Sequence, residues 1–375
     1  MELSADVVIV GAGPAGACVA QALAPTCRVL LFDRADPARP PAERIGESLP
    51  AAARRIFRDL GLWEDFQRQG HLPCYGGWAR WGGPQAVTAD SIADPDGHGW
   101  RLDRARFDAW MRAWAERRGA AVVAPARLAG VASDGDGWRL ALVRNGRPLS
   151  IAARSVVDAG GRAAPLARAL GQRRRRAGRL VCRWLAGPAA DAPSTTVIEA
   201  EPDGWWYTAA LPGGRRVLAF HTDADLPSAG AGREALLGRA SANPVVGPLL
   251  RQVGFDPAGA AQACAAHTSW IDAAAGPGWL AVGDAALTCD PLSSQGLYNA
   301  LYSGFLAAGA LREALDGRAG ALGEYAQAMA RVGQAYRSHL AAWYALETRW
   351  PEAPFWARRR GPPAPAAGDR HAMRV

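Results

Sequence analysis

The chain has 375 residues, of which 49% are hydrophobic and 21% are charged, as in ordinary globular enzymes. This composition excludes a wholly disordered chain, and the length suffices for one or two domains with a large core. The amino terminus has no basic segment ahead of its first apolar run, and no uncharged apolar stretch reaches about eighteen residues. We therefore expect a cytoplasmic protein without a membrane span.

The formal net charge is +8, and all 43 basic residues are arginines because the sequence contains no lysine. They are densest at 173–176, which predicts either a solvated face or a contact with an anionic cofactor or partner. No zinc-finger or RNA-binding motif accompanies this cluster, so nucleic acid is not expected as a partner. The 6 cysteines are scattered without a C-x-x-C pair and predict neither a metal site nor a disulfide framework.

The first elements along the chain are a strand, a glycine-rich turn and a helix. Residues 5–10 (ADVVIV) are a β-branched run typical of buried parallel strands, and residues 17–24 have a helical pattern. Between them, Gly11 allows a tight turn, Gly13 lets the backbone approach a pyrophosphate, and Gly16 lets the helix pack on the strand.

Pro14 and Ala15 complete this turn at the amino terminus of the helix, where amide groups and the helix dipole favour a pyrophosphate. A second strand, residues 28–32, ends at Asp33, and Asp33 and the following Arg34 are expected to bind the cofactor. The Asp33 carboxylate is placed to accept hydrogen bonds from ribose hydroxyls. The spacing predicts a Rossmann-like fold that binds the ADP half of NAD or FAD.

The remaining chain alternates helical and strand-like patterns. Helices are predicted at 51–60, 63–68 and 104–118, from about 295 onward, and at 318–348. Strands and loops are predicted at 74–100, 121–158 and 278–282. Residues 179–270 are predicted to form a sheet that carries helices. The last fifteen residues are low in complexity and are expected to be frayed.

Two later segments resemble motifs of the flavoprotein monooxygenase and flavin-dependent halogenase superfamily: residues 156–162 (VVDAGGR) and 278–285 (GWLAVGDA). The resemblance implies that FAD is the dinucleotide and that the Asp284 carboxylate contacts its ribityl chain. The other FAD contacts that it implies are Gly46, Ser48, Arg104, Asp158, Gly283, Pro291, Ser294, Gln295 and Gly296. A helix opening after the turn at 290–296 would direct amide groups towards the flavin and stabilise negative charge on the reduced ring.

The resemblance also implies a mixed α/β (α+β) fold, in which a Rossmann-like FAD-binding domain of the aromatic-hydroxylase type carries an inserted β-sheet substrate domain. The FAD-binding domain is expected to comprise 1–75, 100–178 and 268–348, the substrate-binding domain 76–99 and 179–267, and a carboxyl-terminal extension 349–375.

A narrower resemblance rests on strings such as GHGWRLDRARFDAW and DPLSSQGLYNAL. They are similar to a branch that includes tryptophan halogenases and maturases that hydroxylate a tryptophan of quinone-cofactor amine and amino-acid oxidases. The halogenases need a lysine and a W-x-W-x-I-P motif, but this chain has no lysine and has Trp205, Trp206 and Tyr207 at the matching place. Because arginine keeps its proton and cannot act as an amine nucleophile, lysine-dependent halogenation is not expected.

We therefore predict an FAD-dependent monooxygenase that forms a flavin C4a-(hydro)peroxide and hydroxylates an electron-rich aromatic group, on a small molecule or on a tryptophan of a peptide or protein. Two alternatives stay open: a flavin-dependent reductase of a prenyl-type double bond, and a non-catalytic flavin-bound assembly factor. No second dinucleotide motif indicates whether NAD(P)H or a separate flavin reductase supplies the electrons.

The catalytic candidates are the titratable side chains nearest the motif loops, Glu47, His71 and His98, and each histidine could instead have a purely structural role. Five aromatic residues are expected to line the substrate pocket or, alternatively, to form ordinary core: Trp78, Trp81, Trp205, Trp206 and Tyr207. No metal ligand set is expected.

Overall fold

The computed structural model describes the chain except for residues 1–2, 37–38, 40–41, 136, 191–193 and 361–375. The fifteen terminal residues that the sequence predicts to be frayed lie outside the described residues. Within the described part, none of the helices combines the length and the apolar character needed to cross a bilayer.

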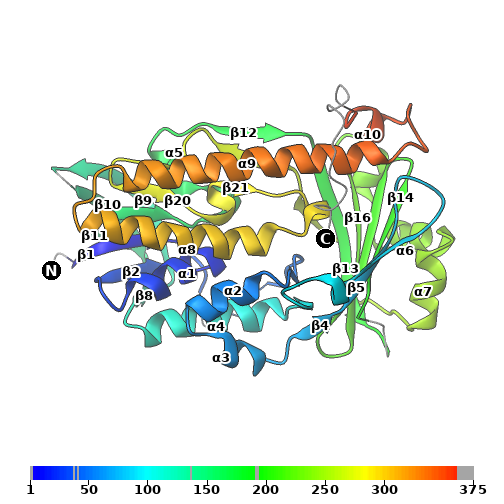
Figure 1. The fold of residues 1–375 in the computed structure, drawn as a ribbon, viewed down its shortest axis with the longest axis horizontal. Helices are drawn as coiled ribbons and strands as arrows, with labels where there is room; N and C mark the ends of the chain where they lie inside the picture. The colour runs from blue at the N-terminus through cyan, green and yellow to red at the C-terminus, as the bar shows by residue number, and fades with distance from the viewer. Residues whose placement is uncertain (1–2, 37–38, 40–41, 136, 191–193, 361–375) are drawn as a thin grey trace.

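An eight-stranded sheet forms one half of the molecule (Figure 1). Its main path is β19–β20–β11–β1–β2–β8, and β10 and β9 continue from β11 as an antiparallel extension. The strands are β1 (Leu3–Val10), β2 (Val29–Phe32), β8 (Ala121–Val123), β9 (Ala126–Asp134), β10 (Gly137–Arg144), β11 (Arg147–Asp158), β19 (Ala275–Gly276) and β20 (Trp279–Ala281). Consecutive residues Val7, Val8 and Ile9 are all fully buried, as expected of a parallel strand covered on both faces.

Helices pack on this sheet, on one another and, at the carboxyl end, against the other half of the molecule. They are α1 (Pro14–Leu23), α2 (Ala53–Asp59), α3 (Trp63–Gln67), α4 (Arg104–Arg117), α5 (Pro165–Ala169), α8 (Gly296–Leu315), α9 (Ala321–Leu346) and α10 (Pro354–Ala357). The helical segments predicted from the sequence therefore form helices, with bounds that differ by a few residues. Two three-stranded sheets join the parts: β12 (Arg174–Ala177), β18 (Thr268–Ile271) and β21 (Leu287–Thr288), and β3 (Ser48–Leu49), β7 (Gly99–Arg101) and β4 (Leu72–Cys74).

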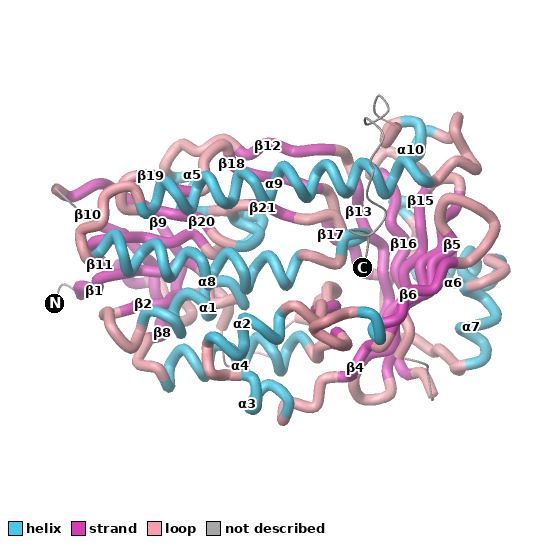
Figure 2. Tube along the Cα trace, viewed as in Figure 1, coloured by secondary structure: helices cyan, strands magenta, loops and turns pink. Residues whose placement is uncertain are grey.

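A seven-stranded sheet forms the second half, in the order β17–β13–β16–β15–β14–β5–β6. Its strands are β5 (Gly76–Arg80), β6 (Val87–Asp90), β13 (Leu180–Pro188), β14 (Thr196–Glu201), β15 (Gly204–Leu211), β16 (Arg215–Asp223) and β17 (Gln262–Ala265). Helices α6 (Arg233–Ala242) and α7 (Val246–Gln252) cover the face turned away from the eight-stranded sheet, here called the outer face (Figure 2). All seven strands come from 76–99 and 179–267, the segments that the sequence predicts to form a substrate-binding domain. We propose that this sheet has that role.

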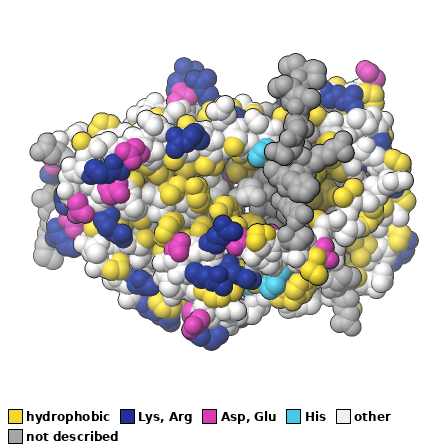
Figure 3. Space-filling model, in the orientation of Figure 1, with side chains coloured by type: hydrophobic (Ala, Val, Ile, Leu, Met, Phe, Trp, Pro, Cys, Tyr) yellow, Lys and Arg dark blue, Asp and Glu magenta, His cyan; other side chains and the backbone are white. Residues whose placement is uncertain are grey.

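Charged side chains on the surface are interspersed, and arginines lie beside acidic residues on the face shown in Figure 3. At the junction of α8 and α9, for example, Arg318 pairs with Glu313 at 2.5 Å and with Glu324 at 2.8 Å. Exposed pairs of this kind contribute little stability, about 0–1 kcal/mol each.

Three tyrosine hydroxyls of helix α9 form hydrogen bonds with the eight-stranded sheet and with the loop that follows β21. Tyr325 donates to the carbonyl of Ala281 in β20 at 2.7 Å. Tyr336 accepts a hydrogen bond from the Asp290 amide at 2.6 Å, and Tyr344 donates to the Asp290 carboxylate at 2.9 Å. The helix thereby links the eight-stranded sheet to the loop that follows β21.

The carboxyl end of α9 is anchored by Glu347, whose side chain is fully buried. Its carboxylate accepts hydrogen bonds from the Gly82 amide at 3.0 Å and from the Arg349 guanidinium at 2.6 Å. The Glu347→Ala variant leaves both donors without this acceptor, so we expect the free energy of unfolding to fall by about 3 kcal/mol in urea titrations. The exposed Glu352→Ala is the control, and equal losses in both variants would contradict the assignment.

Candidate functional site

The turn between β1 and α1 brings three glycines into different environments. A Cβ on Gly11, whose φ is +108°, would lie 2.4 Å from the carbonyl oxygen of Ala159, and one on Gly16 would lie 2.0 Å from the Gly11 oxygen. A Cβ on Gly13 would meet nothing within 4 Å. The first and third glycines therefore pack backbone against backbone, and the second leaves open space at the amino terminus of α1, which no side chain caps.

Asp33 at the end of β2 shapes the same turn. One carboxylate oxygen accepts the Ala12 amide at 2.7 Å and the other accepts the Ala35 amide at 2.7 Å. Each oxygen keeps a lone pair for a further donor such as a ribose hydroxyl. The next residue, Arg34, is exposed.

Asp158 at the end of β11 is fully buried, and both of its carboxylate oxygens accept hydrogen bonds from backbone amides. Gly160 donates to one oxygen at 2.9 Å and Ala167 to the other at 2.7 Å. Burial raises the pKa of Asp158, and these amides oppose the increase. We expect Asp158 to hold the loop before α5 in place without itself reaching the cofactor.

Asp284 lies in η4 (Gly283–Ala285), and its side chain is 38% exposed. The Arg162 guanidinium is 3.8 Å from its carboxylate, and Arg174 donates at 2.7 Å to its carbonyl oxygen. A Cβ on Gly283 would lie 2.9 Å from the Ala15 side chain, so this turn packs directly on α1. The segment 278–285, which resembles the flavoprotein motif, therefore contacts the glycine turn at 11–16.

Sequence reasoning did not identify Arg162 and Arg174 as parts of the site. The only signal for Arg174 was the arginine cluster at 173–176, for which an anionic contact was one of two interpretations. In the structure, Arg174 is half-buried against backbone carbonyls, whereas Arg175 pairs with Asp272 on the surface.

The loop at 46–48 contacts the start of α4. Arg104 donates to the Gly46 carbonyl at 2.7 Å and also pairs with Asp108 at 3.3 Å. Gly46 has a φ of +101°, a conformation that favours glycine, and Ser48 is half-buried in β3. Burial raises the pKa of Asp284, and Arg162, Arg174 and Arg104 oppose this increase.

The turn at 290–296 contains η5 (Pro291–Ser293) and leads into α8. Asp290 caps η5 by accepting the Leu292 amide at 3.0 Å, and Ser294 has a positive φ of 52°. Pro291 and Gly296 are exposed, and Ser294 and Gln295 are half-exposed, so these four predicted contacts remain accessible. Asp290, which the sequence did not single out, is buried, and burial raises its pKa to about 6.

A polar cluster lies on the inner face of the seven-stranded sheet, opposite α6 and α7. The Tyr207 hydroxyl donates to the carboxylate of Glu47, and the Arg101 guanidinium donates to Thr196. Glu47 and Arg101 are only 3% and 5% exposed. Burial raises the pKa of Tyr207 well above its usual value, although nearby Arg101 lowers it. The Arg101 Nε has no partner within the described structure.

The structure separates the five predicted pocket aromatics into two groups. Trp81 and Trp205 pack together towards the inner face, with ring centroids 6.3 Å apart, and Tyr207 shares that face. Trp206 packs with Phe220 in the cluster under α6 and α7, on the outer face. Strand register puts Trp78 on that outer face as well. Trp78 and Trp206 are therefore not brought together with the Glu47 cluster.

The two histidines named as candidates also lie apart from this cluster's hydrogen bonds. His71 is buried against Phe66 and Phe107, accepts the Asp103 amide at 3.3 Å, and has a pKa lowered to about 4 by burial. His98 is half-exposed beside Tyr75. Their catalytic role stays a prediction.

His221 is a functional candidate that the sequence did not indicate. Its ring stacks on Trp205 with centroids 3.8 Å apart, and burial lowers its pKa to about 3, so it is neutral. Trp205 in turn donates to Tyr344 at 3.3 Å, and Tyr344 donates to Asp290. A continuous buried contact thus runs from the inner face to the turn at 290–296.

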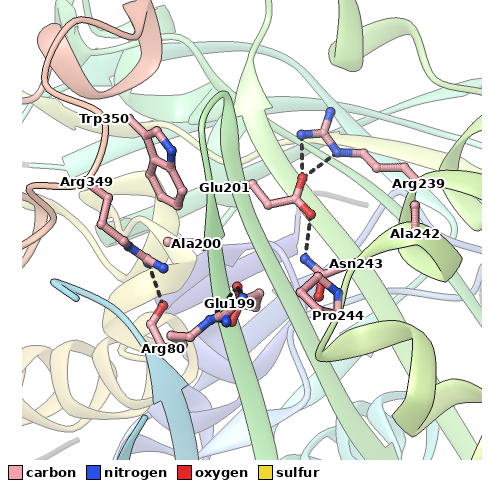
Figure 4. A pocket seen from close by; sticks show the side chains of 10 residues that line it. All are labelled: Arg80, Glu199, Ala200, Glu201, Arg239, Ala242, Asn243, Pro244, Arg349 and Trp350. Atoms are coloured by element: carbon pink, nitrogen blue, oxygen red, sulfur yellow. Dashed lines mark hydrogen bonds and ion pairs between the residues drawn. The ribbon is translucent and has the colours of Figure 1, made fainter. Parts of the chain in front are cut away.

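A surface hollow of about 400 Å³ lies near the outer-face residues Glu199 and Glu201 (Figure 4). Its charged groups pair with one another: Arg80 binds Glu199, and Arg239 binds Glu201. Because these pairs satisfy their own charges and lie away from the dinucleotide turn, we do not assign this hollow to the active site.

The chain matches known flavoproteins in sequence. Residues 4–242 match the FAD binding domain family. The chain is 29% identical, over 95% of its length and 97% of the relative's, to LodB of Marinomonas mediterranea, a protein named as an FAD-dependent oxidoreductase. It is 30% identical, over 84% of its length and 77% of the relative's, to a menaquinone reductase of Mycobacterium tuberculosis.

Solved structures share the fold. The flavin-dependent halogenase CmlS superimposes with a TM-score of 0.84 at 24% identity, covering 97% of this chain and 69% of that one. The peptidyl tryptophan dihydroxylase QhpG superimposes with a TM-score of 0.76 at 28% identity, covering 97% of this chain and 80% of that one.

The convergence of the glycine turn, Asp33, the Arg104 loop and Asp284 defines a flavin-dependent oxidoreductase with the mixed α/β fold of flavin monooxygenases and halogenases. The chain belongs to the FAD binding domain family, and its cofactor is FAD. The open space at Gly13, the uncapped amino terminus of α1 and the free lone pairs of Asp33 fit the ADP half of this cofactor.

Asp284 provides a direct test of this cofactor site. We expect Asp284→Ala to weaken FAD binding at least about tenfold, because a charge-assisted hydrogen bond is worth about 1.5–3 kcal/mol. Asp272→Ala is a matched control, since the Asp272 side chain is 36% exposed and also pairs with an arginine. Equal FAD dissociation constants for both variants, measured by flavin fluorescence, would contradict the assignment.

The burial of Asp290 can be tested through the pH dependence of the protein's stability. Its folded-state pKa of about 6 lies above the ordinary value of 3.8, so the native state loses stability as pH rises between these values. We expect Asp290→Asn to gain up to about 3 kcal/mol over the unmodified protein above pH 6, and to gain nothing below pH 4. Urea titrations at several pH values measure this difference, with the exposed Asp316→Asn as the control.

Proposed function

We propose that the chain is an FAD-dependent monooxygenase that hydroxylates an electron-rich aromatic group, namely a tryptophan side chain within a peptide or protein. The observation that carries this proposal is the buried pair of Glu47 and Tyr207 on the inner face, next to the FAD loop at 46–48. The 28% identity to a peptidyl tryptophan dihydroxylase over 97% of the chain supports the same substrate class.

FAD bound at this site supplies the activation of O₂. A ring carbon that gains oxygen must then lose its proton to restore aromaticity, and a buried carboxylate is a suitable acceptor. Glu47 holds the Tyr207 hydroxyl by a charge-assisted hydrogen bond, which orients the phenol and offers a second polar contact to the substrate. Arg101 contributes a nearby buried positive charge that opposes the effect of burial on the pKa of Tyr207.

Water exclusion is assigned to the inner-face aromatics. Trp81 and Trp205 are 8% and 1% exposed, and their indole N–H groups are bound to the Trp343 carbonyl and the Tyr344 hydroxyl. Because the indole donors are satisfied within the protein, these rings form an apolar wall behind the proposed site. Such a wall suits an indole substrate and limits its contact with water.

Reduction of a prenyl-type double bond is the second candidate, because the chain is 30% identical to a menaquinone reductase. A prenyl tail requires a long apolar lining, whereas Glu47, Arg101 and Thr196 make this part of the inner face polar. We therefore place aromatic hydroxylation first. The electrons are proposed to come from NAD(P)H or from a separate flavin reductase.

The test is to reduce the holo-protein, mix it with oxygenated buffer and tryptophan-containing peptides, and analyse the peptides by mass spectrometry. We expect a gain of one or two oxygen atoms on tryptophan. Peroxide release without oxygen incorporation into any aromatic substrate would contradict the proposal, and turnover of a menaquinone-type substrate would favour the reductase.

The Glu47→Gln variant tests the proton acceptor. We expect it to lower kcat about a hundredfold or more while retaining FAD, as for loss of a general base. Glu43→Gln is the matched control, because Glu43 lies in the same loop but is exposed and pairs with Arg215. A loss of FAD from the Glu47 variant, or an unchanged kcat, would overturn this role.

A further inference from the structure

Two cysteines face each other across neighbouring strands of the inner face. Cys182 in β13 and Cys264 in β17 are direct partners in the antiparallel register. Residues directly opposite in such a pair project from the same face of the sheet. Cys182 is buried, whereas Cys264 is half-exposed on β17, which is the edge strand of the sheet.

The backbone geometry suits a bond between the two sulfurs. The Ala266 amide donates to Leu180, two residues along the register, so Cys182 and Cys264 form a hydrogen-bonded pair. The Cα atoms of such a pair lie about 5.5 Å apart. Disulfides are formed across Cα separations of about 4.4–6.8 Å, which include this one, and the Cβ atoms, about 5 Å apart in such a pair, must approach to about 4 Å for the bond to form.

The thiol pair lies near both the inner-face aromatics and Arg162. The register continues from Cys182 to His221 and from His221 to Trp205, so the pair is two strands, about 10 Å, from the inner-face tryptophan. In addition, Arg162 lowers the pKa of Cys264 and pairs with the Asp284 carboxylate.

The two thiols differ in reactivity. Hydrogen bonding to Cys182 lowers the pKa of Cys264, and Arg162 lowers it further, whereas burial acts in the opposite direction. Burial raises the pKa of Cys182. Since the thiolate is the nucleophile, the accessible Cys264 reacts first and the buried Cys182 resolves the product.

We propose that Cys182 and Cys264 form a redox modification site, a dithiol that hydrogen peroxide converts to a disulfide. The Cys264 thiolate attacks one peroxide oxygen, so an S–O bond forms, the O–O bond breaks, and hydroxide leaves as water after taking up a proton. The Cys182 sulfur then attacks the sulfenic acid, so the S–S bond forms, the S–O bond breaks, and the thiol proton leaves in a second water. The two electrons lost by the sulfurs reduce the peroxide.

The test uses the FAD-loaded protein, reduced with dithiothreitol, freed of it without air, and treated with added hydrogen peroxide. Because the oxidant is added and no substrate is present, the result does not depend on the proposed hydroxylation. We expect a loss of two of the 6 titratable thiols, a cross-linked peptide containing Cys182 and Cys264, and full recovery with dithiothreitol.

Three variants sharpen the test. Cys27→Ser removes a thiol of similar partial exposure and should still lose two thiols. Cys264→Ser should lose none to a disulfide, and Cys182→Ser should accumulate a Cys264 sulfenic acid that dimedone labels. Retention of all thiols in the unmodified protein, a cross-link between other cysteines, or no dimedone label on Cys264 would overturn the proposal.

Discussion

The contact of Gly11 and Gly16 with the surrounding backbone determines where the rest of the cofactor site lies. Since no side chain fits at either position, α1 is held against the end of β1 and against Ala159. Its amino terminus then faces the open space beside Gly13, and Gly283 packs on Ala15 from the other side. The carboxylate of Asp284 and its arginine partners are positioned by this packing, far away along the chain.

The fold could be predicted from the sequence because its strongest signals are local. The spacing from β1 through the glycine turn to Asp33 needs no knowledge of distant contacts, and the structure confirms the elements and the mixed α/β fold. The arginines that complete the site could not be selected in this way. Arg101, Arg162 and Arg174 are three among 43 chemically identical residues, and only tertiary packing distinguishes these buried and half-buried side chains from those on the surface.

The pocket prediction illustrates a different limit. Trp205, Trp206 and Tyr207 are consecutive in a strand, so alternation alone prevents all three from sharing one face. Alternation is a property of the strand itself, and it is enough to separate Trp206 from its two neighbours. It does not say which face is the inner one, because that depends on α6 and α7 covering one side and α9 approaching the other.

Helix α9 also restricts how the molecule can open. At 26 residues it is about 39 Å long, and its first and last tyrosines are hydrogen-bonded to opposite halves of the molecule. A hinge movement between the two sheets would have to bend α9 or break these tyrosine hydrogen bonds. We therefore expect the protein to behave as a rigid frame, with access for a bulky partner depending on movements of surface loops and not on domain closure.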